Sequence, residues 1–184
     1  KLSALGDVVQ ALGPMKAIRR HHEHAHIVLL TTPLYADFFR ASGLVDEIWD
    51  DGRPKGVSRL ARLVRRFHQR GIEASVFVDP VASQIEAAVD TGARIVELHT
   101  GGYANARNSK GRTKELEALR RAARRADAFG LRVAAGHGLE YGNIRAIAAI
   151  PEIEEVNIGF SIIARALFVG LEQAVREMKA LLRR

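Results

Sequence analysis

The chain has 184 residues, 47% of them hydrophobic, and this length and composition exclude a mainly disordered protein. It contains no cysteine, which excludes disulfides and thiolate-bound metals, and we expect a cytoplasmic protein because nothing indicates secretion. No apolar run approaches the roughly 20 residues that span a bilayer, so we expect no membrane partner. Lys1 begins in mid-pattern, and we expect a fragment whose upstream strand is missing.

The basic residues give the chain a formal net charge of +7 and a pI near 10.2, which would suit a nucleic-acid partner. Lysine and arginine are, however, spread over predicted helices, for example at 59–70 and 120–125, without interleaved aromatic residues. We therefore interpret them as solvated helix faces and expect no nucleic-acid partner. A phosphorylated small molecule is an anionic ligand that such a surface would suit.

The first 22 residues begin with the end of a predicted strand. Residues 1–7 (KLSALGD) are typical of a strand end and a glycine-containing turn, and residues 8–22 continue with helical periodicity. Asp7 lies where that helix starts. It is either an N-cap or a carboxylate at the carboxyl end of the first strand, where open α/β sheets bind ligands.

The next segment alternates strands with a helix. The apolar run 26–32 predicts a buried parallel strand that stops at Pro33, 34–41 predicts a helix, and 44–49 a short strand. Four histidines precede or begin the first of these strands, and we interpret them as an exposed helix end. We expect no metal site, because no cysteine or spaced carboxylate accompanies them. They are His21, His22, His24 and His26.

Residues 1 to about 55 carry a first resemblance, on KLSALGDVVQALGPMKAIRRHH, AHIVLLTT and VDEIW. They resemble the N-terminal end of a heptosyltransferase-type glycosyltransferase. The resemblance implies the start of a Rossmann-like acceptor domain, with Asp7 as the catalytic base. It covers under a third of the chain and lacks the donor-nucleotide domain, so sugar transfer would be incomplete.

The chain from residue 50 onward changes to a regular alternation of strands and helices. Residues 50–56 (DDGRPKG) have linker composition, and 57–69 predict a basic amphipathic helix that Gly71 ends. From residue 72 the spacing is that of βα modules. The predicted strands are 74–78, 94–98, the start of 131–139, and 155–158; the predicted helices are 82–89, 114–129, 144–150, 162–169 and 171–182.

With the two earlier strands, the sequence contains about six strand candidates, against the eight of a closed barrel. It therefore predicts an α/β protein with an open parallel sheet flanked by helices, or a half-barrel that a partner subunit closes. A homo-oligomer is compatible with either arrangement, because both leave exposed sheet edges.

The stretch 131–139 (LRVAAGHGL) ends its predicted strand in Gly-His-Gly. The alternation predicts a buried strand that turns into a loop, with the imidazole of His137 at the mouth, where α/β folds place their chemistry. The flanking glycines would let a ligand phosphate approach backbone N–H groups. A tight turn or helix C-cap with an incidental histidine explains the same residues equally well.

Residues 71–184 carry a second resemblance, on SVFVDP from residue 75, VELHTG from 96, AGHGL from 135, NIG from 157 and SIIARA from 161. They resemble the C-terminal half of pyridoxine 5'-phosphate synthase, a family of β/α barrel enzymes that work without a cofactor. The resemblance implies condensation of 3-amino-2-oxopropyl phosphate with 1-deoxyxylulose 5-phosphate.

The same resemblance implies roles for four residues. His137 would donate a proton during ring closure, and Glu97, at the end of its strand, would stabilise charge in a transition state. Gly138 and Gly159 would offer backbone N–H groups to the phosphate of the amino ketone, with Phe160 following in the same loop.

This chain departs from the family pattern at two positions and in its extent. Phe160 stands where the family usually has a histidine, and Ala134 stands where it usually has an asparagine. The family's proton-accepting histidine and glutamate, and its contacts to deoxyxylulose phosphate, lie in the first half of the barrel. We expect that half to be absent here, with the glycosyltransferase-like segment in its place.

The sequence therefore predicts a partial Rossmann-like segment at 1–70 joined to half of a TIM-type β/α barrel at 71–184. Deliberate recombination, natural fusion and an error in assembling the sequence would all produce such a junction. We expect a pyridoxine 5'-phosphate synthase-like protein with weak or absent turnover. The alternatives are a non-catalytic α/β scaffold, with or without phosphate binding, and, third, a glycosyltransferase-like fragment.

Overall fold

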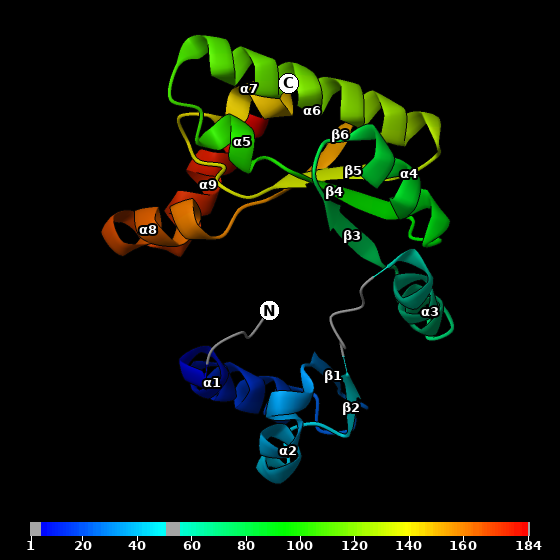
Figure 1. The fold of residues 1–184 in the computed structure, drawn as a ribbon. Coiled ribbons are helices and arrows are strands. Elements are labelled where there is room, and N and C mark those ends of the chain that lie inside the picture. Colours follow the sequence, from blue (N-terminus) through cyan, green and yellow to red (C-terminus); the bar gives the residue numbers. More distant parts are fainter. Residues whose placement is uncertain (1–4, 51–55, 184) are drawn as a thin grey trace. The chain divides into compact units, whose positions relative to one another are not determined.

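The computed structural model describes residues 5–50 and 56–183, and the chain forms two compact units, Lys1–Lys55 and Gly56–Arg184 (Figure 1). The first unit contains α1 (Leu5–His21), β1 (Val28–Thr31), α2 (Pro33–Ser42) and β2 (Glu47–Asp50). The strands β1 and β2 pair in parallel, and Phe39 and Trp49 are fully buried. Pro33 begins α2, and Gly43 ends it with a left-handed φ of 64°.

Asp7 lies inside α1, three residues into the helix, so the prediction that it caps the helix start is wrong. Helical periodicity extends further toward the N-terminus than the glycine at position 6 suggested, because one glycine costs a helix only about 1 kcal/mol. The side chain of Asp7 and the predicted upstream strand end at residues 1–4 lie outside the described residues.

The histidine-rich segment after α1 is an exposed helix end. His21 closes α1, and His26 Nε2 lies 3.2 Å from Glu47 Oε2. Across the described residues, no group of three or more His, Cys, Asp or Glu side chains is arranged to hold a metal ion. None of the described helices combines the length and apolar character needed to cross a bilayer.

The second unit begins with helix α3 and continues as strand–helix repeats. Its sheet contains β3 (Ser75–Val78), β4 (Ile95–His99), β5 (Arg132–Gly136) and β6 (Ile153–Asn157). Its helices are α3 (Val57–His68), α4 (Ala82–Asp90), α5 (Gly101–Ala104), α6 (Ser109–Ala128), α7 (Ile144–Ala148), α8 (Phe160–Val169) and α9 (Leu171–Leu182). The strand order is β3-β4-β5-β6, and every pair is parallel.

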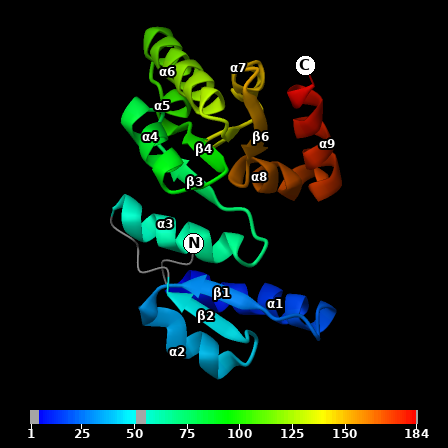
Figure 2. The same ribbon diagram turned by 90° about the vertical axis from the view of Figure 1, so that its right-hand side faces the viewer.

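The sheet buries one face against helices. Val76, Val96, Leu98 and Val133 are buried, and α4 and α6 pack on the sheet, as Figures 1 and 2 show. Alternate residues of the same strands point to the opposite face, where Phe77, Glu97, Ala134 and Glu155 stand in one row across the four strands. The carboxyl ends of all four strands therefore form a single rim.

The predicted fold class is confirmed, because the chain is α/β with wholly parallel sheets. The parallel strands fall into two sheets, of two and four strands, and the larger one corresponds to half of a β/α barrel. The predicted junction between the Rossmann-like segment and the half-barrel, at residues 70 and 71, stays a prediction. The compact units divide earlier, at Lys55 and Gly56, so that α3 belongs to the second unit.

Two details of the second unit differ from the sequence prediction. The short helix α5 was not expected, because its two leading glycines are poor helix formers. Helix α6 begins at Ser109, earlier than predicted, because the side chain of Asn108 caps it by accepting a hydrogen bond from Gly111 N at 2.8 Å.

The buried face of the sheet predicts a strong contrast between two leucines. Leu119 of α6 is 1% exposed, so Leu119→Ala should lower the free energy of unfolding of the second unit by about 2–5 kcal/mol. Leu167→Ala, at a site that is 82% exposed, should change it by about 0.5 kcal/mol or less. Denaturant-dependent hydrogen exchange of the β5 amides measures both, and equal losses would contradict the packing described here.

Candidate active site

Glu97 lies on the open face of the sheet, near the carboxyl rim. Its Oε2 accepts a hydrogen bond from Asn157 Nδ2 at 3.0 Å, across the intervening strand β5. Gly136 of β5 makes this crossing possible, because a Cβ there would overlap Glu97 Oε1. The carboxylate is thus held above Gly136, the one residue of β5 that has no side chain.

Burial raises the pKa of the Glu97 carboxyl above its ordinary value. The hydrogen bond from Asn157 opposes this rise, and the negative charge of Glu155 adds to it. A carboxyl with a raised pKa beside a second carboxylate can hold a proton at a higher pH than an exposed glutamate can.

His137 directly follows β5 in a left-handed conformation, with φ of 85°. It is the one non-glycine residue with positive φ in the described part of the chain, and such residues cost about 1–2 kcal/mol. Thr100, which is fully buried, offsets this cost: its Oγ1 lies 2.7 Å from Gly136 O and 2.6 Å from His137 O, and its N–H donates to Gly136 O at 2.8 Å.

A second histidine lies against His137. The rings of His99 and His137 have centroids 4.7 Å apart, and His99 Nδ1 lies 3.2 Å from Asp79 Oδ1. Gly101 fits against both rings, since a Cβ there would lie 2.8 Å from His99 Cε1 and 3.1 Å from His137 Cδ2. Asp79, at the end of β3, is itself held by Gln84, whose Oε1 accepts from Asp79 N at 2.8 Å.

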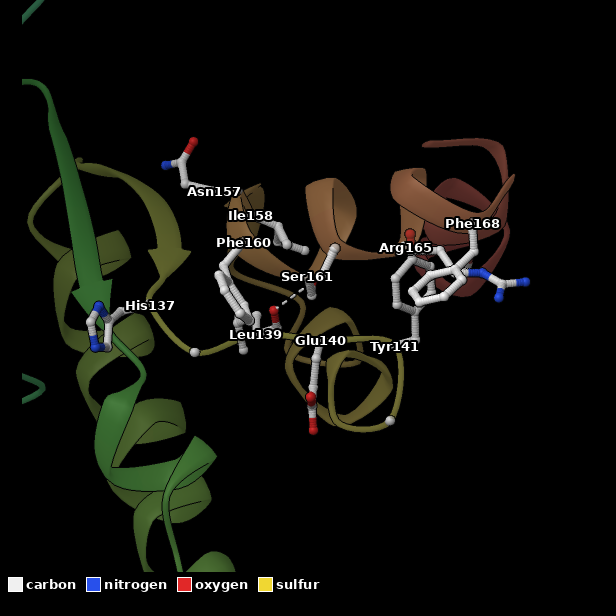
Figure 3. Close-up of a pocket in the computed structure, with 14 residues that line it drawn as sticks. His137, Leu139, Glu140, Tyr141, Asn157, Ile158, Phe160, Ser161, Arg165 and Phe168 are labelled. Carbon is white, nitrogen blue, oxygen red and sulfur yellow. Dashed lines mark hydrogen bonds between the residues drawn. The ribbon is translucent and has the colours of Figure 1, made fainter. Parts of the chain in front are cut away.

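A pocket of about 900 Å³ opens beside His137, between the loop after β5 and helix α8 (Figure 3). Gly138, in the loop after β5, and Gly159, directly before α8, both line it. Gly138 has φ of 74° and its carbonyl accepts from Asn143 Nδ2 at 3.1 Å, while Ser161 Oγ donates to Leu139 O at 3.0 Å and joins the loop to α8. Gly159 is the N-cap of α8, so the first turn of that helix faces the pocket.

Two exposed phenylalanines and one cation of α8 line the pocket. Phe160 is 90% exposed and lies nearer His137, whereas Phe168 is 85% exposed and lies at the far end of the pocket (Figure 3). Arg165 also lines it, and Glu177 Oε2 and Oε1 accept from its Nε and Nη2 at 2.8 and 3.1 Å. This ion pair holds the pKa of Glu177 below its ordinary value. Figure 3 shows Arg165 and Phe168 at the opposite end from His137.

The structure places the predicted residues of the second unit on one rim but divides them between two subsites. His137, Gly138, Gly159 and Phe160 line the pocket, whereas Glu97 does not and is joined to it through Asn157. Glu97 is the central residue of β4, so the expectation that it ends its strand is wrong; His99 ends it. Asp7 belongs to the first unit, and its side chain lies outside the described residues.

Sequence reasoning missed Asp79, His99, Gly101 and Asn157 as members of this site. All four lie in the motifs SVFVDP, VELHTG and NIG, which carry the resemblance. Their position at or directly after the end of a predicted strand could have indicated them as site residues. Their mutual contacts depend on strand order, which periodicity does not reveal.

The comparison with protein families agrees with this geometry. Residues 52–184 match the family model described as "Pyridoxal phosphate biosynthesis protein PdxJ". The chain belongs to the PdxJ family. The PdxJ match begins next to the boundary between the two compact units, at Lys55 and Gly56.

Curated relatives of the PdxJ family match the same region. The pyridoxine 5'-phosphate synthase of Magnetococcus marinus is 55% identical over 125 residues, which cover 68% of this chain and 51% of that protein. The enzyme of the same name from a Synechococcus species is 53% identical over 126 residues, or 68% of this chain and 50% of that protein. The chain thus spans about half the length of these relatives.

Among solved structures, a 3-hexulose-6-phosphate synthase superimposes with a TM-score of 0.56 at 17% identity. The superposition covers 95% of this chain and 82% of that one. At this identity the likeness concerns the fold alone, and it agrees with the α/β architecture described above.

Because Gly136 has no side chain, a methyl group added there should displace the Glu97 carboxylate. Gly136→Ala should push the Glu97 carboxylate away and break its hydrogen bond with Asn157, because the new Cβ would overlap Glu97 Oε1. Gly159→Ala is the control, since a Cβ there meets nothing within 4 Å. The side-chain amide resonances of Asn157 should move in the first variant and stay in the second; the reverse pattern would refute this geometry.

The raised pKa of Glu97 predicts how stability depends on pH. The pKa of Glu97 in the folded protein exceeds the unfolded value of about 4.3, so between these two values the folded state binds more protons than the unfolded state. The free energy of unfolding therefore falls as the pH rises through this window. Glu97→Gln should abolish this part of the slope, as measured by thermal unfolding across the window.

Carbon-13 NMR titration of the Glu97 carboxyl tests the causes directly. Glu155→Gln should lower its pKa by removing a like charge, and Asn157→Ala should raise it by removing a hydrogen bond to the ionised form. Shifts of the opposite sign would contradict the assignment.

Proposed function

We propose that this chain carries the amino-ketone half of a pyridoxine 5'-phosphate synthase site. The observation that carries the proposal is the convergence of His137, Gly138 and Gly159 on one pocket, with Glu97 on the neighbouring strand of the same rim. The substrate class is a phosphorylated small molecule, 3-amino-2-oxopropyl phosphate, which would condense with 1-deoxyxylulose 5-phosphate.

In this proposal the phosphate binds where two backbone segments meet. Gly138 and Gly159 both line the pocket and would offer it their N–H groups, which no side chain of their own shields. The first turn of the ten-residue helix α8 would add its positive dipole end. Phe160 replaces a polar neighbour in this loop, so phosphate affinity should rest mainly on backbone donors.

The amino-ketone carbon skeleton would then lie toward the rim, between the pocket and Glu97. His137 is positioned to donate a proton there, since its ring forms one end of the pocket. Glu97, with its raised pKa and its hydrogen bond from Asn157, would stabilise charge that develops as the ring closes.

Turnover by this chain should be weak or absent. The chain spans about half the length of the curated synthases. The resemblance implies that the family's proton-accepting groups belong to the other half. Loss of one general acid or base typically costs about 10² to 10⁴-fold in rate, and more than one group is involved.

Product formation tests the proposal. The purified chain with both substrates should form pyridoxine 5'-phosphate slowly or below detection by fluorescence chromatography, and any activity should fall in His137→Ala but not in His24→Ala, an exposed histidine of the first unit. A rate that His137→Ala leaves unchanged would sink the catalytic assignment.

Phosphate binding separates a retained site from a purely structural scaffold, which is the second candidate function. Isothermal titration with inorganic phosphate should show binding that Gly159→Pro weakens, because proline removes the N–H, and that Gly159→Ala preserves. Absence of binding to the unmodified chain would leave a non-catalytic α/β scaffold.

The third candidate concerns the first unit. Residues 1–55 form their own compact unit beside the start of the PdxJ match, which favours a separate origin of the glycosyltransferase type with Asp7 as the remnant of its base. Titration of the whole chain with a nucleotide sugar tests this candidate, and no binding would remove it.

A further inference from the structure

Both outer strands of the four-stranded sheet lack a strand on one side. In the described part of the chain, β3 pairs with β4 and β6 pairs with β5, and neither has a second strand neighbour. The outer edge therefore presents main-chain groups along 75–78 in β3 and along 154–157 in β6. Two such edges on a parallel sheet form a template for added strands.

A groove follows the outer edge of β6. It has a volume of about 490 Å³, and Glu154, Glu155 and Val156 of the strand and Leu182 of α9 are among its lining residues. Helix α9 packs against α7 and α8, and Asn157, the last residue of the strand, lines the larger pocket. A groove bounded by a strand edge and a helix has the shape that an extended segment fills.

The opposite edge of the sheet presents apolar surface. Phe77 of β3 is 55% exposed, and Ile72 and Val81, on either side of that strand, are about as exposed. On the β6 side, the exposed residues Phe160 and Phe168 of α8 line the hollow where β6 ends. Apolar side chains at both edges would leave water if the two edges met.

We propose that a second copy of this chain pairs with both edges, so that two second units form one eight-stranded β/α barrel. A two-fold axis along the barrel axis keeps every strand parallel, and four strands from each copy give the eight that close a TIM-type barrel. β6 of each copy then pairs with β3 of the other, so one symmetry operation satisfies both edges.

The dimer would also bring the two sites to one rim. Each copy contributes Glu97, His99 and His137 at the carboxyl ends of its strands, and the parallel closure places both sets at the same mouth. This inference goes beyond the proposed function, because it depends on the edges of the sheet and not on phosphate chemistry.

Cross-linking of cysteine variants tests the pairing of β3 with β6. The chain has no cysteine, so Ser75→Cys on β3 and Glu155→Cys on β6 each introduce a single thiol at an exposed position of the open face. A short bis-maleimide should link a mixture of the two variants into a covalent dimer and should link neither variant alone. The control replaces the first variant with Ser109→Cys, at the start of α6, and should give no link.

Sedimentation measures the assembly itself. The unmodified chain should sediment with a mass near twice 20.2 kDa. Phe77→Glu should raise the dimer Kd at least about tenfold, whereas Phe129→Glu, at a similarly exposed phenylalanine outside the sheet, should not. Circular dichroism of both variants separates lost assembly from lost folding.

The outcomes divide cleanly. A covalent dimer formed only from the mixture, together with a dimeric mass, supports the closed barrel. A monomeric mass overturns it, whether the edge of β6 pairs with strands of the same chain or stays unpaired. A dimer in which a single variant links to itself also overturns it, because like edges would then meet.

Discussion

The parallel pairing of β4 with β5 is the constraint on which the rest of the site depends. It brings Glu97, His99 and the loop at His137 to one rim, although 40 residues of sequence separate Glu97 from His137. The absence of a side chain at Gly136 and at Gly101 then sets how closely these groups approach one another. Two glycines thus determine the geometry of the charged and aromatic side chains around them.

The site combines two environments, which the proposed phosphorylated substrate would use for different parts of its structure. The pocket between the β5 loop and α8 offers backbone donors with few charged side chains, whereas the open face offers carboxyl, amide and imidazole groups. His137 and Asn157 belong to both, so they connect the part that would hold a phosphate with the part that would handle protons.

The sequence predicted most strands and helices because local periodicity reports burial directly. It predicted Glu97 and His137 through motifs, and their shared rim through the rule that parallel strands end together. It missed the contact of Asp79 with His99 and of Glu97 with Asn157, because these depend on strand order and register. It also placed Asp7 at the start of a helix that begins earlier, since a single glycine does not stop a helix.

The left-handed backbone at His137 makes Thr100 a restraint on the imidazole. The hydroxyl and amide of Thr100 hold the carbonyl groups of Gly136 and His137, on either side of the strained φ angle of His137. These hydrogen bonds are worth about as much free energy as the strain that they oppose. An isosteric valine at this position would let the loop relax toward an ordinary conformation and carry the ring off the rim. A residue that touches no substrate would then govern how the histidine is aimed.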